Sequence, residues 1–387
     1  LDIYTGNPEK PGSKTDNGFS RFNYRWSNTL NYTKALGGGH TIGALAGTEY
    51  TQEEFKSYTI SSIGYPTANN NTQNIAAENT NFGTAKYDWT LVSFFGRLEY
   101  NYAGKYFLNG SIRRDGSSRF AVNNKYGNFY AGGASWVISR EEFLSGSRNV
   151  NMLRLFVSTG TSGNFNIGNY EHLTTFGFGR YNGLSMEFPV RPGNPNLTWE
   201  KSMMTSAGID YGFFENRVSG TLAAFQKNTT ALLLDRPLSS TTGFGSRLEN
   251  VGELQNRGIE FNINIDIIRT RDFNWSVGGN LTLQRNKITE LYGTSDTIPQ
   301  DDAGTQWVVG EPVNTFFLVR SAGVDAQTGK PLYYTQNGEI SDEFSTSYAT
   351  LLTGKSPDPR YFGSINTAVS YKGLTLSGEF FFSGRNY

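Results

Sequence analysis

The chain has 387 residues, and its 34 lysines and arginines balance its 34 aspartates and glutamates. This neutral balance gives no electrostatic reason to expect nucleic acid or an anionic membrane surface as a partner. Cysteine is absent and there are only two histidines, His40 and His172, which excludes disulfide frameworks and zinc–thiolate sites and argues against a histidine-based metal centre. We therefore expect no cofactor, no metal and no nucleic-acid partner.

Aromatic residues make up 14% of the chain and glycine contributes 45 residues, a combination that favours strands and turns over helices. In chain order, apolar and polar residues alternate with the period of two that is typical of half-buried strands. The alternation is clearest at 22–32, 91–115, 153–157, 203–213, 259–265, 273–283 and 365–382. These stretches predict an all-β fold of about 12 antiparallel strands, arranged as roughly six hairpins.

The connections between the predicted strands are alternately short and long. Short turns are predicted at Gly37–Gly39, Ala103–Lys105, Phe214–Asn216, Thr270–Arg271 and Lys372–Gly373, while the region between 138 and 151 has no clear turn pattern. Longer polar connections are predicted at 53–88, 117–126, 162–198, 231–254 and 289–360. This asymmetry is typical of an outer-membrane β-barrel, in which tight periplasmic turns oppose long extracellular loops and tilted strands of about 9 to 11 residues span the bilayer.

The hairpin at 91–120 illustrates the two faces of such a sheet. Phe94 and Leu98 belong to an apolar stripe that we predict to face lipid. Arg114 interrupts that stripe, and we expect its long side chain to reach the headgroup region near the end of its strand. The opposite face carries charges that we predict to face the lumen, either against a plug or lining a water-filled interior: Arg97, Glu99, Arg113 and Asp115.

No run of about 18 apolar residues is present, so the sequence predicts no transmembrane helix. The chain begins at Leu1 without an initiator Met or a signal peptide, and it stops within a predicted strand, so we interpret it as a mature or truncated piece of a longer protein. A soluble β-sandwich or propeller would show the same alternation. It would rarely combine strands of about 10 or more residues with loops of such unequal length.

Seven segments carry a more specific signal than this pattern. In chain order they are RRDGSSRFAVNNKYGNFYAGGASWVISREEF (113–143), STGTSGNFNIGNY (158–170), NPNLTWEKS (194–202), GIDYGFFENRVSGTLAAFQKNTTALLL (208–234), NVGELQNRGIEFNINI (250–265), AGVDAQTGKPLYY (322–334) and SPDPRYFGSINTAVSYKGLTLSGEFFF (356–382). Together they resemble the barrel of the SusC/RagA family of TonB-dependent transporters from Bacteroidota outer membranes. The resemblance covers nearly the whole chain from about residue 20 onward.

The resemblance implies a nutrient importer with a barrel of about 22 strands, an N-terminal plug, energy supplied through TonB, a SusD-like surface lipoprotein as partner, and an oligosaccharide or peptide as cargo. Residues 1–387 then form part of the TonB-dependent receptor β-barrel domain, with about 12 of its strands. We see no plug domain and no N-terminal extension in the sequence. The resemblance places the protein in the bacterial outer membrane, in contact with its lipid.

Candidate cargo contacts come from aromatic residues in or beside the long loops, since aromatic faces stack on sugar rings and peptide side chains. They are Phe176, Phe178, Tyr181, Trp307, Tyr333 and Tyr334. The competing interpretation is that these rings pack the loops on themselves. The segment DGSSRF (115–120) is interpreted as a structural strand ending, because Asp, Gly and Ser are common turn residues.

Adjacent carboxylates are interpreted as solvated surface charge rather than as an acid–base pair, at Glu141–Glu142 and at Asp301–Asp302. With Asp296, the second pair could instead form a calcium loop, although its spacing matches no EF-hand.

Three alternatives to the importer remain open at this stage. A complete 12-stranded pore or autotransporter-type translocator without TonB coupling requires the first and last strands to pair with each other. An enzyme in a barrel, such as a lipase, requires a Ser-His-Asp-like set, but neither histidine has a recognisable partner, so we predict that the protein is not an enzyme. A soluble β-sandwich adhesin would have no continuous lipid-facing belt.

Overall fold

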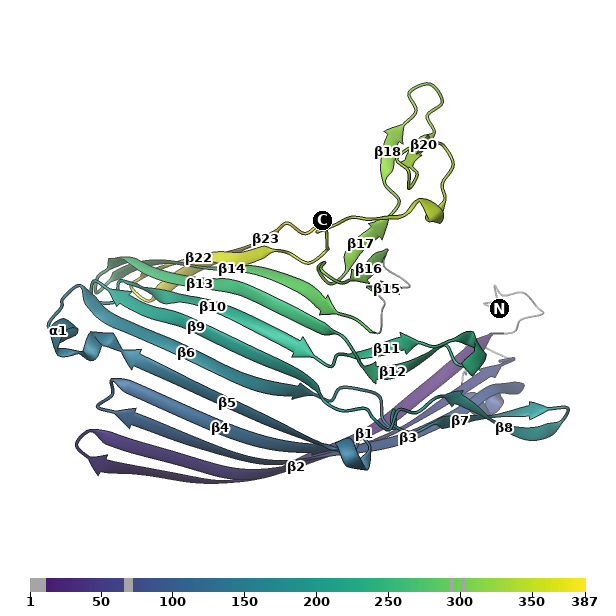
Figure 1. Cartoon of the computed structure of the whole chain (residues 1–387), viewed down its shortest axis with the longest axis horizontal. Helices are drawn as coiled ribbons and strands as arrows, with labels where there is room; N and C mark the ends of the chain where they lie inside the picture. The colour runs from purple at the N-terminus through teal and green to yellow at the C-terminus, as the bar shows by residue number, and fades with distance from the viewer. Residues whose placement is uncertain (1–11, 66–71, 293–295, 301–303) are drawn as a thin grey trace.

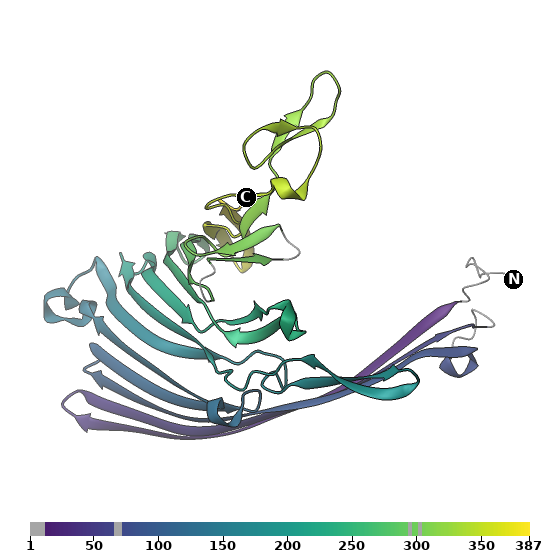
Figure 2. The same cartoon turned by 45° about the vertical axis from the view of Figure 1, so that its right-hand side comes forward.

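The structure of the protein is a computed structural model that describes residues 12–65, 72–292, 296–300 and 304–387. One antiparallel sheet of 12 strands dominates it and curves like part of a barrel wall (Figures 1 and 2). In order across the sheet the strands are β1 (Ser13–Gly37), β2 (His40–Ile63), β3 (Glu78–Tyr102), β4 (Tyr106–Ser117), β5 (Tyr126–Val137), β6 (Val150–Asn164), β9 (Glu200–Phe213), β10 (Val218–Thr230), β13 (Glu253–Arg269), β14 (Phe273–Glu290), β22 (Tyr361–Tyr371) and β23 (Leu374–Gly384). Each strand pairs with the next one along the chain that belongs to this sheet, which confirms the predicted antiparallel meander.

The two edges of the sheet are β1 and β23. Among the described residues, β1 pairs only with β2 and β23 pairs only with β22. The complete 12-stranded pore required β1 and β23 to pair with each other, and the described strands are not closed in this way. Because an open strand edge leaves backbone groups unpaired, such a sheet needs further strands to be stable in lipid.

Tight turns join the strands at one end of the sheet, on the left in Figure 1. The turn between β1 and β2 places Gly38 and Gly39 at φ +57° and +85°, a conformation that glycine adopts without steric cost. The region between 138 and 151, in which no clear turn was predicted, contains a 3₁₀ turn η3 (Ile138–Arg140) and a single helical turn α1 (Glu142–Ser145). Among the described residues, no helix is long and apolar enough to cross a membrane.

The opposite end of the sheet carries the long loops, four of which begin and end within three residues of their predicted bounds. Each of the three longest contains small sheets of its own. These are β7 (Thr175–Tyr181) with β8 (Leu184–Arg191); β11 (Leu233–Pro237) with β12 (Ser246–Asn250); β15 (Thr297–Gln300), β16 (Thr305–Val308), β17 (Thr315–Leu318) and β21 (Thr350–Leu351); and β18 (Ser321–Val324), β19 (Pro331–Tyr334) and β20 (Ile340–Ser341).

The predicted loop at 53–88 was wrong in its bounds. Strand β2 continues to Ile63 and β3 begins at Glu78, so the first three strands are 24 or 25 residues long and extend well beyond the thickness of a bilayer. Their outer halves are mostly polar, which is why the sequence pattern suggested a loop. The backbone ladder needs no apolar face to continue, and cross-strand contacts such as the stacking of Phe55 on Tyr87 at 4.7 Å reinforce it.

The two faces of the hairpin β3–β4 follow the predicted alternation. Phe94, Leu98 and Ile112 lie on one face with exposed fractions of 50%, 68% and 64%, whereas Ser93 on the other face is fully buried. On the apolar face, the Arg114 guanidinium lies 4.7 Å from the centre of the Tyr126 ring, which is closer to the loop end of the sheet. This orientation agrees with the prediction that Arg114 reaches away from the apolar belt.

A hydrophobic cluster anchors the loops above β4, β5 and β9. Trp199 and Leu197 are almost fully buried against Phe120 and Phe129, and the Trp199 ring lies 5.3 Å from that of Phe165. The indole N–H of Trp199 donates a hydrogen bond of 3.0 Å to the backbone carbonyl between β4 and β5, so the ring is satisfied as well as packed. The cluster ties together three connections that are far apart in the sequence.

We predict that Trp199→Ala lowers the free energy of unfolding of the full-length protein by about 3–5 kcal/mol, the usual cost of removing a large buried aromatic side chain. Urea unfolding in lipid vesicles measures this difference. Phe178→Ala is the control, because Phe178 is 82% exposed and its removal opens no cavity. Equal losses of stability in the two variants would contradict the role of the cluster.

Candidate functional site

The predicted lumen-facing charges form a network on the polar face of β3 and β4. The Nε–H of Arg113 donates to both carboxylate oxygens of Asp115, at 2.7 and 3.0 Å, and its terminal nitrogen donates to the hydroxyl of Ser93 at 2.8 Å. The same guanidinium lies 3.6 Å from Glu49 and 5.3 Å from the centre of the Phe95 ring. Two carboxylates therefore compensate the charge of Arg113.

Two further pairs of charges lie on this face. Arg97 forms an ion pair with Glu99 on the same strand, and both side chains are about half exposed. Further around the sheet, Asp210 accepts hydrogen bonds from Arg154 on one neighbouring strand and from the Thr221 hydroxyl on the other, at 2.7 and 2.8 Å. The polar face of the sheet is thus hydrophilic with little uncompensated charge at these positions.

The hairpin β7–β8 carries three of the predicted cargo contacts. Phe176 and Phe178 lie on one face of β7, and Tyr181 lies on the other, with exposed fractions of 51%, 82% and 74%. A two-residue turn at Asn182 and Gly183 closes the hairpin. Both residues have positive φ, as in the type I′ turn that an Asn-Gly pair favours. It projects away from the strands that carry it (Figure 1).

The other predicted contacts pack within their own loops. Trp307 lies against a buried cluster built on Ile288 and Leu291, and its indole N–H donates to the side chain of Asn314 at 3.3 Å. Tyr333 meets the ring of Phe344 edge-on at 5.3 Å. The Arg320 guanidinium covers the ring of Tyr334, 5.1 Å from its centre.

The six rings therefore lie on three separate loop modules: the β7–β8 hairpin, the β15–β17 sheet and the β18–β20 sheet. The β7–β8 hairpin is apart from the other two modules in both views of the molecule, whereas the β18–β20 sheet directly follows the β15–β17 sheet (Figures 1 and 2). The structure does not bring the six rings into one binding site, and Phe176, Phe178 and Tyr181 are the three that remain exposed.

The segment DGSSRF serves a structural purpose, as the sequence suggested. Asp115 and Ser117 are buried, and Phe120 enters the hydrophobic cluster around Trp199. The Arg119 guanidinium lies 5.0 Å from the Trp89 ring.

The interpretation of Glu141 as solvated surface charge was wrong. Its carboxylate oxygens accept hydrogen bonds from the Lys105 ammonium at 2.9 Å, the Trp136 indole at 3.0 Å and the Tyr106 hydroxyl at 2.7 Å. These donors, Lys105 first, lower the pKa of Glu141 to about 2. The carboxylate clamps the β3–β4 turn to the β5–β6 connection. Asp301 and Asp302 lie outside the described residues.

We predict that Glu141→Gln lowers the melting temperature of the full-length protein at neutral pH. A lowered carboxyl pKa stabilises the fold above about pH 4.5, and this contribution is lost as the pH falls towards about 2. The difference between wild type and variant therefore shrinks over that interval, as melting curves at several pH values would show. Glu142→Gln is the control, since Glu142 is exposed. A constant difference down to pH 2 would contradict the clamp.

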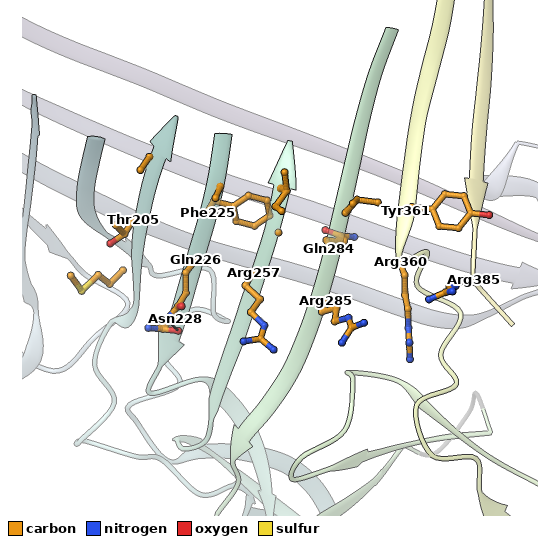
Figure 3. Close-up of a pocket in the computed structure, with 16 residues that line it drawn as sticks. Thr205, Phe225, Gln226, Asn228, Arg257, Gln284, Arg285, Arg360, Tyr361 and Arg385 are labelled. Carbon is orange, nitrogen blue, oxygen red and sulfur yellow. Dashed lines mark hydrogen bonds between the residues drawn. The ribbon is translucent and has the colours of Figure 1, made fainter. Parts of the chain in front are cut away.

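A groove that the sequence analysis missed lies on the apolar face of the sheet, at its loop end. Figure 3 shows Arg257, Arg285 and Arg360 extending side by side from neighbouring strands, with Arg385 beside them. The alternation of the sequence could have indicated this groove. Arg257 is two positions from Ile259 and Arg285 is two positions from Leu283, so each arginine shares a face with an apolar residue of its strand.

Comparisons with known proteins agree with this fold. The family model described as TonB dependent receptor-like, beta-barrel, matches residues 2–385. The chain belongs to this family. It is 35% identical over 393 residues to TonB-dependent receptor P26 of Formosa agariphila, covering 92% of the chain. It is 30% identical over 324 residues to TonB-dependent receptor SusC of Bacteroides thetaiotaomicron, covering 77% of the chain.

Among solved structures, the RagAB peptide importer in its open-open state superposes with a TM-score of 0.89 at 28% identity, over 97% of the chain. The resemblance to the SusC/RagA family is thus confirmed, and the protein is a segment of an outer-membrane β-barrel. The chain spans only part of its relatives, with 38% of the Formosa receptor, 31% of SusC and 42% of the RagAB chain.

Proposed function

We propose that the complete protein containing this chain imports a nutrient, either an oligosaccharide or a peptide, across the bacterial outer membrane. The observation that carries the proposal is the superposition of nearly the whole chain on the RagAB peptide importer. In this proposal residues 1–387 supply part of the barrel domain. A plug and an N-terminal extension belong to other parts of the polypeptide.

The partners follow from the same family relationship. The relatives are named TonB-dependent receptors, which supports energy coupling through TonB by way of the plug region. The likeness to SusC and to RagAB supports a SusD-like surface lipoprotein that covers the loop end of the barrel. In this arrangement cargo is held between the long loops and the lipoprotein, and it enters the lumen when TonB acts on the plug.

The lumenal wall suits a neutral or zwitterionic cargo. The charges of Arg113 and Arg154 are compensated by carboxylates on their own or adjacent strands, so no strong field opposes or retains an uncharged sugar or a peptide. The same charges offer hydrogen-bonding groups in place of water. Exposed rings on the β7–β8 hairpin supply apolar stacking surfaces at the loop end.

We propose transport without catalysis, because both histidines are used structurally. The His40 Nδ1 lies 2.7 Å from the Tyr100 hydroxyl, and its ring stacks on Tyr102 at 4.5 Å. The His172 Nδ1 lies 3.1 Å from the backbone carbonyl of Arg119. Within the part of the chain that the structure describes, neither ring is paired with a serine and a carboxylate in the way that a hydrolase requires.

The proposal is tested by deleting the full-length gene and measuring uptake of labelled oligosaccharide and peptide mixtures. We predict that deletion abolishes uptake of one of the two classes and that the wild-type gene restores it. A Phe176→Ala/Phe178→Ala variant should restore uptake with an apparent affinity about tenfold weaker, since each lost stacking contact costs about 0.5–1.5 kcal/mol.

The control is Phe143→Ala, which removes an exposed ring at the opposite end of the barrel and should behave as wild type. Unchanged uptake of both cargo classes in the deletion strain would contradict import. Equal affinity in the two aromatic variants would leave import intact but contradict the role of the β7–β8 hairpin.

A further inference from the structure

The groove lined by Arg257, Arg285, Arg360 and Arg385, here called the basic groove, lies on the lipid-facing side of the sheet. Arg257 is two residues from Ile259 on β13, and Arg285 is two residues from Leu283 on β14. Because side chains two apart on a strand share a face, both arginines point to the side of these exposed apolar residues. They stand roughly 7 Å further towards the loop end.

Strand register and backbone hydrogen bonds bring the four arginines to the same end of the sheet. Arg257 and Arg285 are directly opposite each other on β13 and β14. The backbone carbonyl of Arg360 accepts from the amide of Gln284, next to Arg285, and the amide of Arg360 donates to the carbonyl of Gly384, next to Arg385. Arg360 immediately precedes β22 and Arg385 immediately follows β23, and both line the same groove as Arg257 and Arg285.

On β9 and β10 the positions that match Arg257 carry no charge. On β9 the matching position is Thr205, whose hydroxyl bonds to Thr159 on β6 at 2.9 Å, and on β10 it is Gln226. The neighbouring strands are therefore polar but neutral where β13 and β14 are cationic. Lys287, one step further out on β14, adds a fifth positive charge.

Among the described residues, no ion pair involves Arg257, Arg285 or Arg385, in contrast to the paired arginines of the lumenal face such as Arg113 and Arg154. Two acids line the adjoining space, but Glu311 accepts from the amide of Gly354 at 2.7 Å and Asp358 accepts from the side chain of Asn286.

Like charges directly opposite each other destabilise a sheet, so the pairing of Arg257 with Arg285 carries a cost. That cost is offset when an anion lies between the two guanidinium groups. Guanidinium is well suited to phosphate, because its planar set of N–H donors binds two oxygens at once.

The shape of the basic groove indicates what carries the phosphate. The groove has a volume of about 1050 Å³ and is lined on its membrane side by Ala207, Ala224, Ile259 and Leu283. An apolar floor below a cationic rim matches a molecule with acyl chains below a charged headgroup. A soluble anion would leave the apolar floor in contact with water.

We propose that the basic groove binds a phosphorylated lipid of the outer leaflet, with its phosphates on the arginines and its acyl chains on the apolar belt. The site lies on the wall that faces away from the lumen, so it is separate from the path of cargo. The bound lipid holds one side of the barrel against the membrane. The long loop between β14 and β22 lies beside this site and packs against the same arginines.

Native mass spectrometry of the full-length protein in detergent tests this proposal, with bisphosphorylated lipid A and its dephosphorylated form as probes. We expect the wild type to retain the bisphosphorylated lipid and to lose the dephosphorylated one. In Arg257→Gln/Arg285→Gln, retention should fall by at least about tenfold, since hydrogen bonds to charged groups contribute about 1.5–3 kcal/mol each.

The matched control is Arg217→Gln/Arg271→Gln, which removes two exposed positive charges from the turns at the opposite end of β10, β13 and β14. This variant should retain the lipid as wild type does. Equal retention in the two double variants, or equal binding of the dephosphorylated lipid, would overturn the proposal. Displacement of the lipid by an equimolar amount of inorganic phosphate would assign the groove to a free anion instead.

A second readout separates lipid from protein partners. If the Arg257→Gln/Arg285→Gln variant keeps its lipid but no longer co-purifies with a surface lipoprotein, the groove is a protein-docking surface and the lipid proposal is wrong. Folding is monitored by the heat-dependent gel mobility of the barrel, which should be the same for both double variants.

Discussion

The structure depends on one constraint: a backbone that crosses lipid must satisfy every N–H and C=O group within the protein. The 12-stranded sheet meets this requirement through an antiparallel ladder in which each inner strand pairs on both sides. Once the ladder is fixed, side chains must alternate between lipid and lumen, and the two ends of the sheet become distinct. The tight turns, the long loops and the two chemically different faces all follow from this ladder.

The ladder also determines where charge is tolerated. On the lumenal face arginines such as Arg113 and Arg154 pair with carboxylates on their own or adjacent strands, so the wall stays hydrophilic at little electrostatic cost. On the lipid-facing side the pattern changes at the loop end, where Arg257 and Arg285 lie directly opposite each other and form no ion pair with any described residue. The first arrangement suits a passage for cargo and the second suits an anion held at the membrane surface.

The fold was largely predictable from the sequence, because period-two alternation and the asymmetry of turns and loops are direct consequences of a barrel. The predicted lengths of β1–β3 were wrong, because a polar stretch such as residues 53–63 has the same pattern in a loop and in a strand that extends into water. The role of Glu141 also escaped prediction, because its three donors come from β3–β5 positions that only the folded sheet brings together. Loop aromatics such as Trp307 could not be divided into packed and exposed rings without the loop structures.

The central claim is that odd-numbered residues of β13 face lipid while even-numbered residues face a watery lumen. The most direct measurement is spin labelling of single cysteines placed at Ile259 and Ile263, and at Glu260 and Asn264, in a cysteine-free full-length protein in native outer membranes. Labels at the first pair are expected to collide mainly with oxygen dissolved in lipid, and labels at the second pair mainly with a water-soluble nickel chelate. Equal access of the chelate to both pairs would contradict a transmembrane barrel wall.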